Sequence, residues 1–230
     1  MLLFYFPGAC SFAEMVVLHW NGEPFRLCRL TREERGSPPY TTAVNPHGQV
    51  PAMILNGRVL TENAALLNYL ADRRPELGLL PRHGTWERYV ADRWLSWLDS
   101  GFHAAHVPLF KPAKFSPRPE VQRHLQEWCV REIRSVVGEL DDHLRGRRHA
   151  VFAHRNVFDA YIAAMARWSR RVMDHERDAP HLHAFLRRMD EDEGVRFANA
   201  VEAGEIVAPT STAPGFQGHV SLAEAIGMLA

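Results

Sequence analysis

Cys10 is the residue of this chain whose type and position best suit chemistry. It follows the apolar run Leu2–Phe6, which predicts a buried strand, and a Pro7-Gly8 break, after which an amphipathic helix is predicted. A helix start presents unpaired N–H groups and the positive end of the helix dipole, which together stabilise a thiolate. Because the thiolate is the nucleophilic form of cysteine, this position favours redox or nucleophilic chemistry. The alternative is a small buried core thiol.

The other two cysteines read as core residues. Cys28 falls inside a predicted strand, and Cys129 lies in the apolar stripe of a predicted helix. Pro7 occupies the position where a C-x-x-C motif would place the partner of Cys10, so an intramolecular dithiol mechanism is not expected. If Cys10 does redox chemistry, its partner thiol arrives as substrate.

A proline opens one of the predicted strands. Pro51 cannot donate a ladder hydrogen bond, so it marks a strand start or an edge. A cis Val50-Pro51 bond would leave the backbone of Val50 free to pair with an extended, peptide-like ligand. An ordinary trans proline is the commoner alternative.

Thr61-Glu62-Asn63 stands at a predicted helix start. The N–H groups there can receive a ligand carboxylate, while Glu62 could hold an ammonium group. Together they suit the head group of an α-amino acid. The alternative is a common helix cap with favourable charge in the first turn.

Two histidines lie on the long helix predicted after residue 85. His103 and His106 share a polar face with Ser96, Asp99 and Ser100 at α-helical spacing, and this face could line a cleft. No nearby Glu or Cys completes a ligand set around His-x-x-His, so we expect no metal site.

The first 80 residues predict a compact α/β domain. Helices are expected over Cys10–Trp20 and Glu62–Asp72, with an irregular stretch around Ser37-Pro38-Pro39, and Asn56-Gly57 is a strong hairpin signal. The predicted strands are Leu2–Phe6, Phe25–Leu30, Pro51–Leu55 and Arg58–Leu60.

Strand signals end after a linker at Leu77–Thr85, and the rest predicts a helix bundle. Asn156-x-x-Asp159 is the start signal of one buried helix. Ala208–Gly218 reads as an irregular tail, followed by a helix from Ser221 with Glu224 completing a capping box. The predicted domains are 1–80, 86–205 and a C-terminal extension over 206–230.

Composition excludes several classes of protein. Lys+Arg and Asp+Glu are equal at 27 each, so no global field would recruit nucleic acid or anionic lipid. No segment approaches the ~20 apolar residues of a membrane span, and the N-terminus does not read as a secretory signal. Three cysteines are too few for a disulfide framework. We therefore expect a cytoplasmic protein.

Four segments together resemble the bacterial, beta-class glutathione transferases. LFYFPGACS, NPHGQVPA, LTENAALLNYLAD and NVFDAYIAAMARW match the family pattern in order and spacing, over roughly residues 1–200. The resemblance implies a thioredoxin-like N-terminal domain carrying glutathione, followed by an all-helical C-terminal domain, and a homodimer. It also implies a detoxifying enzyme that conjugates glutathione to small electrophiles or reduces glutathione mixed disulfides through Cys10.

The resemblance also implies residue roles, and it implies no metal. Cys10, with Ser11 beside it, would lie at the glutathione sulfur. His103, five residues before Pro108, matches the family's active-site histidine from the helical domain. Val50 would offer its backbone to the cysteinyl unit beside a cis Pro51, and Glu62 and Asn63 would hold the γ-glutamyl end. Gln49 and Ser100 complete the glutathione-binding candidates.

The sequence departs from the family pattern in several places. His47 replaces a common Lys, and the basic residue for the glycyl carboxylate falls within Arg32–Arg35. The tail beyond about residue 205 has no counterpart. Two alternatives therefore stay open: a binding or regulatory protein that lost turnover, and a specialised dehalogenase or ether-cleaving enzyme with a different electrophile pocket.

Overall fold

The computed structural model describes residues 1–229, which form two compact units. Unit 1 combines Met1–Leu80 with the segment from Asp190 onward, and unit 2 is Pro81–Met189. Among the described residues, no helix is both long and apolar enough to span a membrane.

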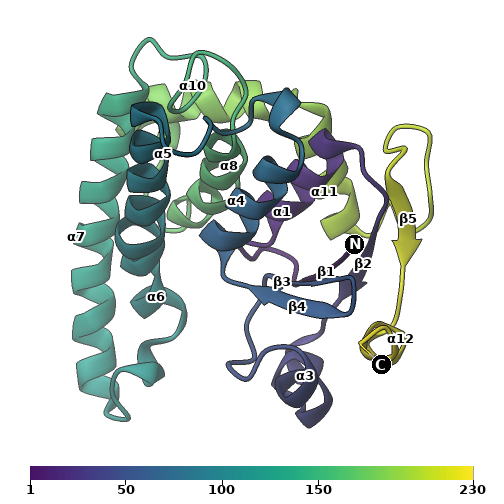
Figure 1. Cartoon of the computed structure of the whole chain (residues 1–230). Helices are drawn as coiled ribbons and strands as arrows, with labels where there is room; N and C mark the ends of the chain where they lie inside the picture. The colour runs from purple at the N-terminus through teal and green to yellow at the C-terminus, as the bar shows by residue number, and fades with distance from the viewer. Residues whose placement is uncertain (230) are drawn as a thin grey trace. The chain divides into compact units, whose positions relative to one another are not determined.

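Unit 1 is built on a mixed sheet with the strand order β4-β3-β1-β2-β5 (Figure 1). The strands are β1 (Leu2–Tyr5), β2 (Phe25–Arg29), β3 (Ala52–Leu55), β4 (Arg58–Thr61) and β5 (Phe216–His219). β1 runs parallel to β2 and antiparallel to β3, and β3 and β4 form a hairpin. Its turn, Asn56-Gly57, has positive φ at both residues, as a two-residue hairpin loop requires. The four strands predicted near the N-terminus are confirmed.

Helices α1 (Phe12–Asn21) and α4 (Asn63–Arg73) are confirmed within a residue or two of the predicted bounds and pack against each other. The prediction of an irregular stretch around Ser37 is wrong. It holds two short helices, α2 (Arg32–Gly36) and α3 (Pro38–Ala43), and a 3-10 turn, Pro75–Leu77, follows α4. A capping box starts α2: Thr31 Oγ1 accepts from Glu34 N–H, and the Glu34 carboxylate accepts from Thr31 N–H. Pro38 suits the first turn of α3 because its fixed φ is helical and its missing N–H is not needed.

The C-terminal extension contains a strand that the sequence did not predict. β5 pairs in parallel with β2 at the edge of the sheet, and the Phe25 N–H donates to the Gly215 carbonyl at 2.8 Å. A Cβ on Gly215 would lie 2.6 Å from the Glu23 carbonyl oxygen, so only glycine fits there. Helix α12 (Leu222–Gly227) follows, and its predicted capping box between Ser221 and Glu224 is confirmed.

Helix α11 (Glu193–Ala203) joins unit 1 rather than the helical domain in which we expected it. It packs along α1 (Figure 1), and Trp20 Nε1 donates to Asp192 Oδ1 at 2.8 Å just before α11 begins. Phe197 of α11 contacts Phe25 of β2 with ring centroids 5.9 Å apart. The helical unit therefore ends at Met189, whereas the predicted helical domain extends to residue 205.

Unit 2 is all-helical, as expected. Its elements are α5 (Trp86–Trp97), a π-helical segment η2 (Leu98–His103), α6 (Ala104–Phe110), a 3-10 turn (Pro112–Lys114), α7 (Pro119–Leu144), α8 (Val157–Ser169), α9 (His175–Asp178) and α10 (Pro180–Met189). At the start of α8, the Asp159 carboxylate accepts from the Asn156 N–H at 3.1 Å, which confirms this half of the predicted start signal. The Asn156 amide nitrogen donates to the His154 carbonyl instead of capping α8.

Candidate active site

Cys10 lies where the sequence predicted it, between β1 and the start of α1. Its Sγ lies 3.6 Å from the Val50 carbonyl oxygen, and the residue is 6% exposed. Ser11, beside it, is fully buried, and its Oγ accepts from the Phe6 N–H at 3.4 Å. The Ser11 hydroxyl thus holds the loop after β1, while the sulfur of Cys10 faces the Val50-Pro51 segment.

Strand register brings three predicted segments to one end of the sheet. Phe4 of β1 pairs with Ala52 of β3, and Ala52 pairs with Thr61 of β4. We call this the site end of the sheet, defined by Phe4, Ala52 and Thr61. The loop to Cys10 leaves β1 here, Val50-Pro51 enters β3 here, and Glu62-Asn63 follows β4 here. Segments more than 50 residues apart in the sequence, such as those of Cys10 and Glu62, therefore meet.

The Val50-Pro51 bond is cis, as the family resemblance implied. Gln49, just before it, has an exposed side chain, and its carbonyl accepts from the Tyr40 hydroxyl at 2.6 Å and the Asn45 amide at 3.1 Å. These two donors hold the backbone that leads to Val50. Burial raises the pKa of Tyr40, so the hydroxyl stays protonated and keeps donating.

Glu62 precedes the first residue of α4 and has a positive φ of 73°. Such backbone is rare for a residue with a side chain and clusters at ligand-binding sites. The side chain of Glu62 is exposed at the helix start, whereas Asn63 is 6% exposed. The arrangement presents a carboxylate next to the first N–H groups of a helix, where the positive end of the helix dipole lies.

Arg35 is the residue of the Arg32–Arg35 stretch that reaches this region. Its guanidinium carbon lies 4.8 Å from the centroid of the Phe6 ring, in the loop leaving β1. Its carbonyl oxygen would lie 2.9 Å from a Cβ on Gly48, in the segment leading to Val50. Sequence alone could not single out Arg35 because two arginines, Arg32 and Arg35, occupy this short stretch.

His103 and Ser100 lie in unit 2, on the π-helical segment. His103 is half-buried against Trp168, with ring centroids 5.1 Å apart, and burial and the charge of Lys111 lower its pKa. Ser100 is exposed and its hydroxyl donates to the Ser96 carbonyl at 2.8 Å. Their place beside the glutathione sulfur stays a prediction.

The prediction that His106 shares a polar face with His103 is wrong. The π-helical turn over Leu98–His103 changes the angular spacing, so His106 is fully buried and contacts the Phe102 carbonyl through Nδ1 at 2.8 Å. Burial lowers the pKa of His106 to about 4. A π-helical turn has no clear sequence signal, which is why α-helical spacing misplaced this residue.

Two aromatic residues near His103 were not predicted as site residues. The Trp168 ring contacts His103, and Phe110 contacts Trp168 with ring centroids 5.5 Å apart. The Arg171 guanidinium lies 5.0 Å from the Phe110 centroid. Trp168 continues the apolar spacing of α8, and such spacing does not separate a core residue from one that lines a site.

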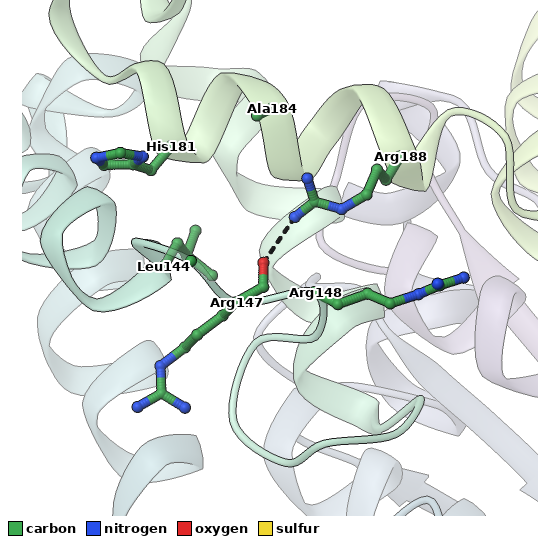
Figure 2. A pocket seen from close by; sticks show the side chains of 7 residues that line it. Leu144, Arg147, Arg148, His181, Ala184 and Arg188 are labelled. Carbon is green, nitrogen blue, oxygen red and sulfur yellow. Dashed lines mark hydrogen bonds between the residues drawn. The ribbon is translucent and has the colours of Figure 1, made fainter.

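Unit 2 also holds a pocket of about 340 Å³, drawn in Figure 2. Its lining consists of Leu144, Gly146, Arg147, Arg148, His181, Ala184 and Arg188. None of these is a predicted site residue. Figure 2 shows the Arg147 and Arg148 side chains pointing in different directions, and Arg188 donates to the Arg147 carbonyl at 2.8 Å. The charged groups do not converge, so we place the candidate active site at the site end of the sheet instead.

The residues that the structure describes contain no cluster of three or more His, Cys, Asp or Glu side chains suited to a metal ion.

Comparison with known proteins bears on the identity of this fold and site. Residues 9–73 match the family model described as glutathione S-transferase, N-terminal domain. The chain is 31% identical to glutathione S-transferase GST-4.5 of Xanthomonas campestris and 34% identical to glutathione S-transferase GstA of Escherichia coli O157:H7. Each match covers 88% of this chain and 98% of the relative.

The chain belongs to the glutathione S-transferase family. It is therefore an enzyme of the transferase class, and the resemblance drawn from its motifs is confirmed. Because the matches span nearly all of each relative but not all of this chain, this transferase is longer than those two.

Solved structures agree with the two-part architecture. The chain matches a sphingomonad glutathione S-transferase complexed with glutathione at 33% identity and a TM-score of 0.78, covering 88% of this chain and 99% of that one. It matches a bacterial beta class glutathione S-transferase of Sphingomonas chungbukensis at 35% identity and a TM-score of 0.77, covering 88% and 98%. The predicted fold class is confirmed. These findings favour the transferase over the non-catalytic and ether-cleaving alternatives.

Proposed function

We propose that this transferase binds glutathione at the site end of the sheet and uses Cys10 at the glutathione sulfur. The observation that carries the proposal is the convergence there of Cys10, the cis Val50-Pro51 segment and Glu62-Asn63. The solved relative complexed with glutathione supports glutathione as the co-substrate.

The chemistry of each group suggests how the tripeptide lies. The backbone of Val50 pairs with the cysteinyl unit, as a strand pairs with an added peptide. Glu62 holds the ammonium of the γ-glutamyl unit, and Asn63 with the α4 N-terminus receives its carboxylate. Arg35 holds the glycyl carboxylate, and the exposed side chain of Gln49 lies alongside.

Two reactions fit this arrangement. In conjugation, the glutathione thiolate attacks an electrophilic carbon and a leaving group departs or a double bond is saturated. In thiol transfer, the Cys10 thiolate attacks the glutathione sulfur of a mixed disulfide and the substrate thiol leaves. A second glutathione thiolate then attacks the Cys10 mixed disulfide, which releases Cys10 and oxidised glutathione. The second thiol must come from solution, because Cys28 and Cys129 are buried.

We assign His103 and Ser100 of unit 2 to the electrophile side of the site. Because burial lowers its pKa, His103 is neutral near pH 7 and can take or give a hydrogen bond without charge. Trp168 and Phe110 beside it offer apolar surface for a small electrophile.

We further propose a cytoplasmic homodimer with a detoxifying role. Three free cysteines suit a reducing compartment. Helix α5 exposes a contacting aromatic pair, Trp86 and Tyr89, that are 71% and 56% exposed with ring centroids 4.9 Å apart. Exposed aromatic surface of this kind marks an interface, and a second copy is its proposed occupant.

Calorimetry with reduced glutathione tests the proposal. Wild-type protein is expected to bind, and Glu62→Gln is expected to bind more weakly because the ammonium loses its charged partner. Absence of binding by the wild type at millimolar glutathione overturns the proposal. A panel of electrophiles and glutathione mixed disulfides then separates conjugation from thiol transfer.

A further inference from the structure

Helix α12 of the C-terminal extension packs on one face of the sheet. It contacts β2 and α3, and Figure 1 shows α3 and α12 on the opposite side of the sheet from α1 and α4. We call Leu222, Ala225 and Ile226 the apolar stripe of α12, because their spacing of three and four residues places them on one side of the helix. Ala225 is fully buried. The proposed glutathione contacts do not involve this stripe.

One hydrophobic cluster joins the apolar stripe of α12 to the proposed glutathione site. Besides the stripe, it includes Tyr40 of α3 and Val44, which follows α3 directly. It also includes Val50, the residue before the cis Pro51. The residue whose backbone is proposed to receive glutathione therefore shares its packing with α12.

The segment formed by α2 and α3, residues 32–43, is too short to be helical by itself. α2 has five residues and α3 has six, whereas isolated helices shorter than about 12 residues are marginal in water. Tyr40 is buried in the cluster, while the residues of α2 are exposed or half-buried. The contact between α3 and α12 therefore adds to the packing that keeps this segment folded.

The α2-α3 segment carries two groups that lie close to the site end of the sheet. The Tyr40 hydroxyl donates to the Gln49 carbonyl at 2.6 Å, and the Tyr40 ring lies edge-on to Phe4 with centroids 5.5 Å apart. The Arg35 guanidinium carbon lies 4.8 Å from the centroid of the Phe6 ring. A shift of this segment would move both the hydroxyl that holds Gln49 and the cation proposed for the glycyl carboxylate.

Cys28 of β2 can report on this packing. It is fully buried in the same cluster. Burial raises the pKa of its thiol to about 12, and the carboxylates of Glu34 on α2 and Glu224 on α12 add to the rise. Both helices therefore lie near this sulfur, and displacement of α12 would expose it.

We propose that α12 supports the α2-α3 segment and thereby positions Tyr40 and the Val50 backbone for glutathione. The residues of its apolar stripe are positioning residues, because they act through Tyr40 and Val50 and not on the ligand itself. The effect on glutathione binding rests on the proposed function, whereas the support of α3 does not.

Ala225→Asp and Ala223→Asp form a matched pair of variants of the full chain. Both place the same charge on α12, but Ala225 is buried in the cluster and Ala223 is exposed. Ile226→Ala is a milder change on the same stripe. Three properties are measured: alkylation of Cys28 by N-ethylmaleimide, located by peptide mapping; hydrogen exchange at the Val44 amide; and binding and turnover of glutathione.

We expect Ala225→Asp to speed the alkylation of Cys28 and the exchange of the Val44 amide by about tenfold or more, because local opening then costs less free energy. The Val44 N–H donates to the Tyr40 carbonyl at 2.9 Å, so its exchange reports on the end of α3. The Leu66 amide of α4, which donates to the Glu62 carbonyl at 2.9 Å, should keep its wild-type rate. Ala223→Asp should stay within about twofold of wild type in every measurement.

The dissociation constant and KM for glutathione should rise about three- to tenfold in Ala225→Asp, the range of one modest hydrogen bond, because Tyr40 is displaced from Gln49. kcat at saturating glutathione should stay within about twofold, because α12 does not touch the reacting atoms. Ile226→Ala should shift the same quantities in the same direction by smaller factors, and it decides the outcome if Ala225→Asp also speeds exchange at Leu66. Wild-type exchange at Val44 overturns the support of α3, and an unchanged dissociation constant despite faster exchange overturns the positioning role.

Tyr40→Phe tests the link from α3 to the Val50 backbone. It keeps the ring in the cluster and removes the hydroxyl that donates to Gln49. We expect it to raise the dissociation constant for glutathione without speeding the alkylation of Cys28, and the double variant with Ala225→Asp should bind little more weakly than either single variant. Fully additive effects contradict a shared route through Tyr40. If the wild type does not bind glutathione, the proposed function fails, while Cys28 and Val44 still decide whether α12 supports α3.

Discussion

Glu62 combines an exposed carboxylate with a backbone conformation that residues with side chains rarely adopt. Its positive φ of 73° costs about 1–3 kcal/mol, which the surrounding structure must offset. A cost of this kind is tolerated where it positions a functional group. The conformation places the carboxylate just before α4, where a ligand ammonium and carboxylate can be held together.

Comparing Glu62→Gly with Glu62→Ala separates the effect of Glu62 on stability from its effect on glutathione binding. Both are expected to weaken glutathione binding by about 1–3 kcal/mol, because each removes a charged hydrogen-bond partner. Glycine adopts positive φ without a steric cost, so the Gly variant is expected to be about 1 kcal/mol more stable to unfolding than the Ala variant. Urea unfolding and calorimetry measure the two effects. An Ala variant as stable as the Gly variant would show that the backbone at Glu62 is not strained.

The burial of His106 leads us to predict a specific dependence of the free energy of unfolding on pH. Its pKa is about 4 in the folded protein, because burial disfavours the charged form, against an ordinary value of 6.5. Between these values the unfolded chain binds a proton that the folded chain does not, so stability falls as pH drops through this window. The loss from this residue should be about 2–4 kcal/mol.

Replacing His106 with Asn removes this titration and keeps a donor for the Phe102 carbonyl. Urea unfolding at several pH values is expected to show a flatter dependence in His106→Asn. The exposed His124→Asn serves as control and should keep the wild-type slope. An unchanged slope in His106→Asn would mean that His106 is not buried in its neutral form. Part of the slope should persist, because burial also lowers the pKa of His175 to about 4.

At the scale of elements, β5 depends on a glycine that fits where no side chain can. Gly215→Ala places a Cβ 2.6 Å from the Glu23 carbonyl oxygen, so the start of β5 must move away from β2. We expect a loss of about 1–3 kcal/mol in stability, typical of overpacking, and faster hydrogen exchange at the Phe25 and Val220 amides. Gly227→Ala, with no atom within 4 Å of its Cβ, is the control. Equal exchange rates in both variants would contradict the close pairing of β5 with β2.

Elements with a strong local signal could be predicted from the sequence. The apolar run before Pro7, the Asn56-Gly57 turn and the capping box at Ser221 each act within a few residues, and each is confirmed. β5 could not be predicted, because Phe216–His219 is short and contains two residues, Gly218 and Gln217, that do not favour strands. Its pairing with β2 specifies it as a strand.

The site shows the same division between local and long-range information. Cys10, Val50-Pro51 and Glu62-Asn63 could be named because each stands at a recognisable junction of elements. The hydrogen bond that the Gly8 N–H donates to Glu202 of α11 could not be predicted, because it joins positions 194 residues apart. The π-helical turn over Leu98–His103 could likewise not be predicted from α-helical spacing. Because of this turn, His106 lies in the core.

At the scale of the whole molecule, the proposed homodimer predicts the effect of changing the aromatic pair on α5. Trp86→Glu places a charge on surface that the second copy would cover. We therefore expect the dissociation constant of the dimer to rise at least tenfold, which corresponds to about 1.4 kcal/mol or more. Trp128→Glu on α7, where Trp128 is 44% exposed, is the matched control. Analytical ultracentrifugation measures both. A wild type that sediments as a monomer, or a Trp86→Glu variant that dimerises normally, contradicts this interface.

The proposed function depends on Cys10 being the residue that meets the glutathione sulfur. Treatment with oxidised glutathione, followed by intact-mass measurement and peptide mapping, tests this most directly. We predict one glutathione per chain, attached to Cys10 as a stable mixed disulfide because no resolving thiol follows C-x-x-C spacing. Cys28 and Cys129, both fully buried, should stay unmodified, and Cys10→Ala should take up no glutathione. Modification centred on Cys129, or full thiol-transfer activity in Cys10→Ala, would contradict the account.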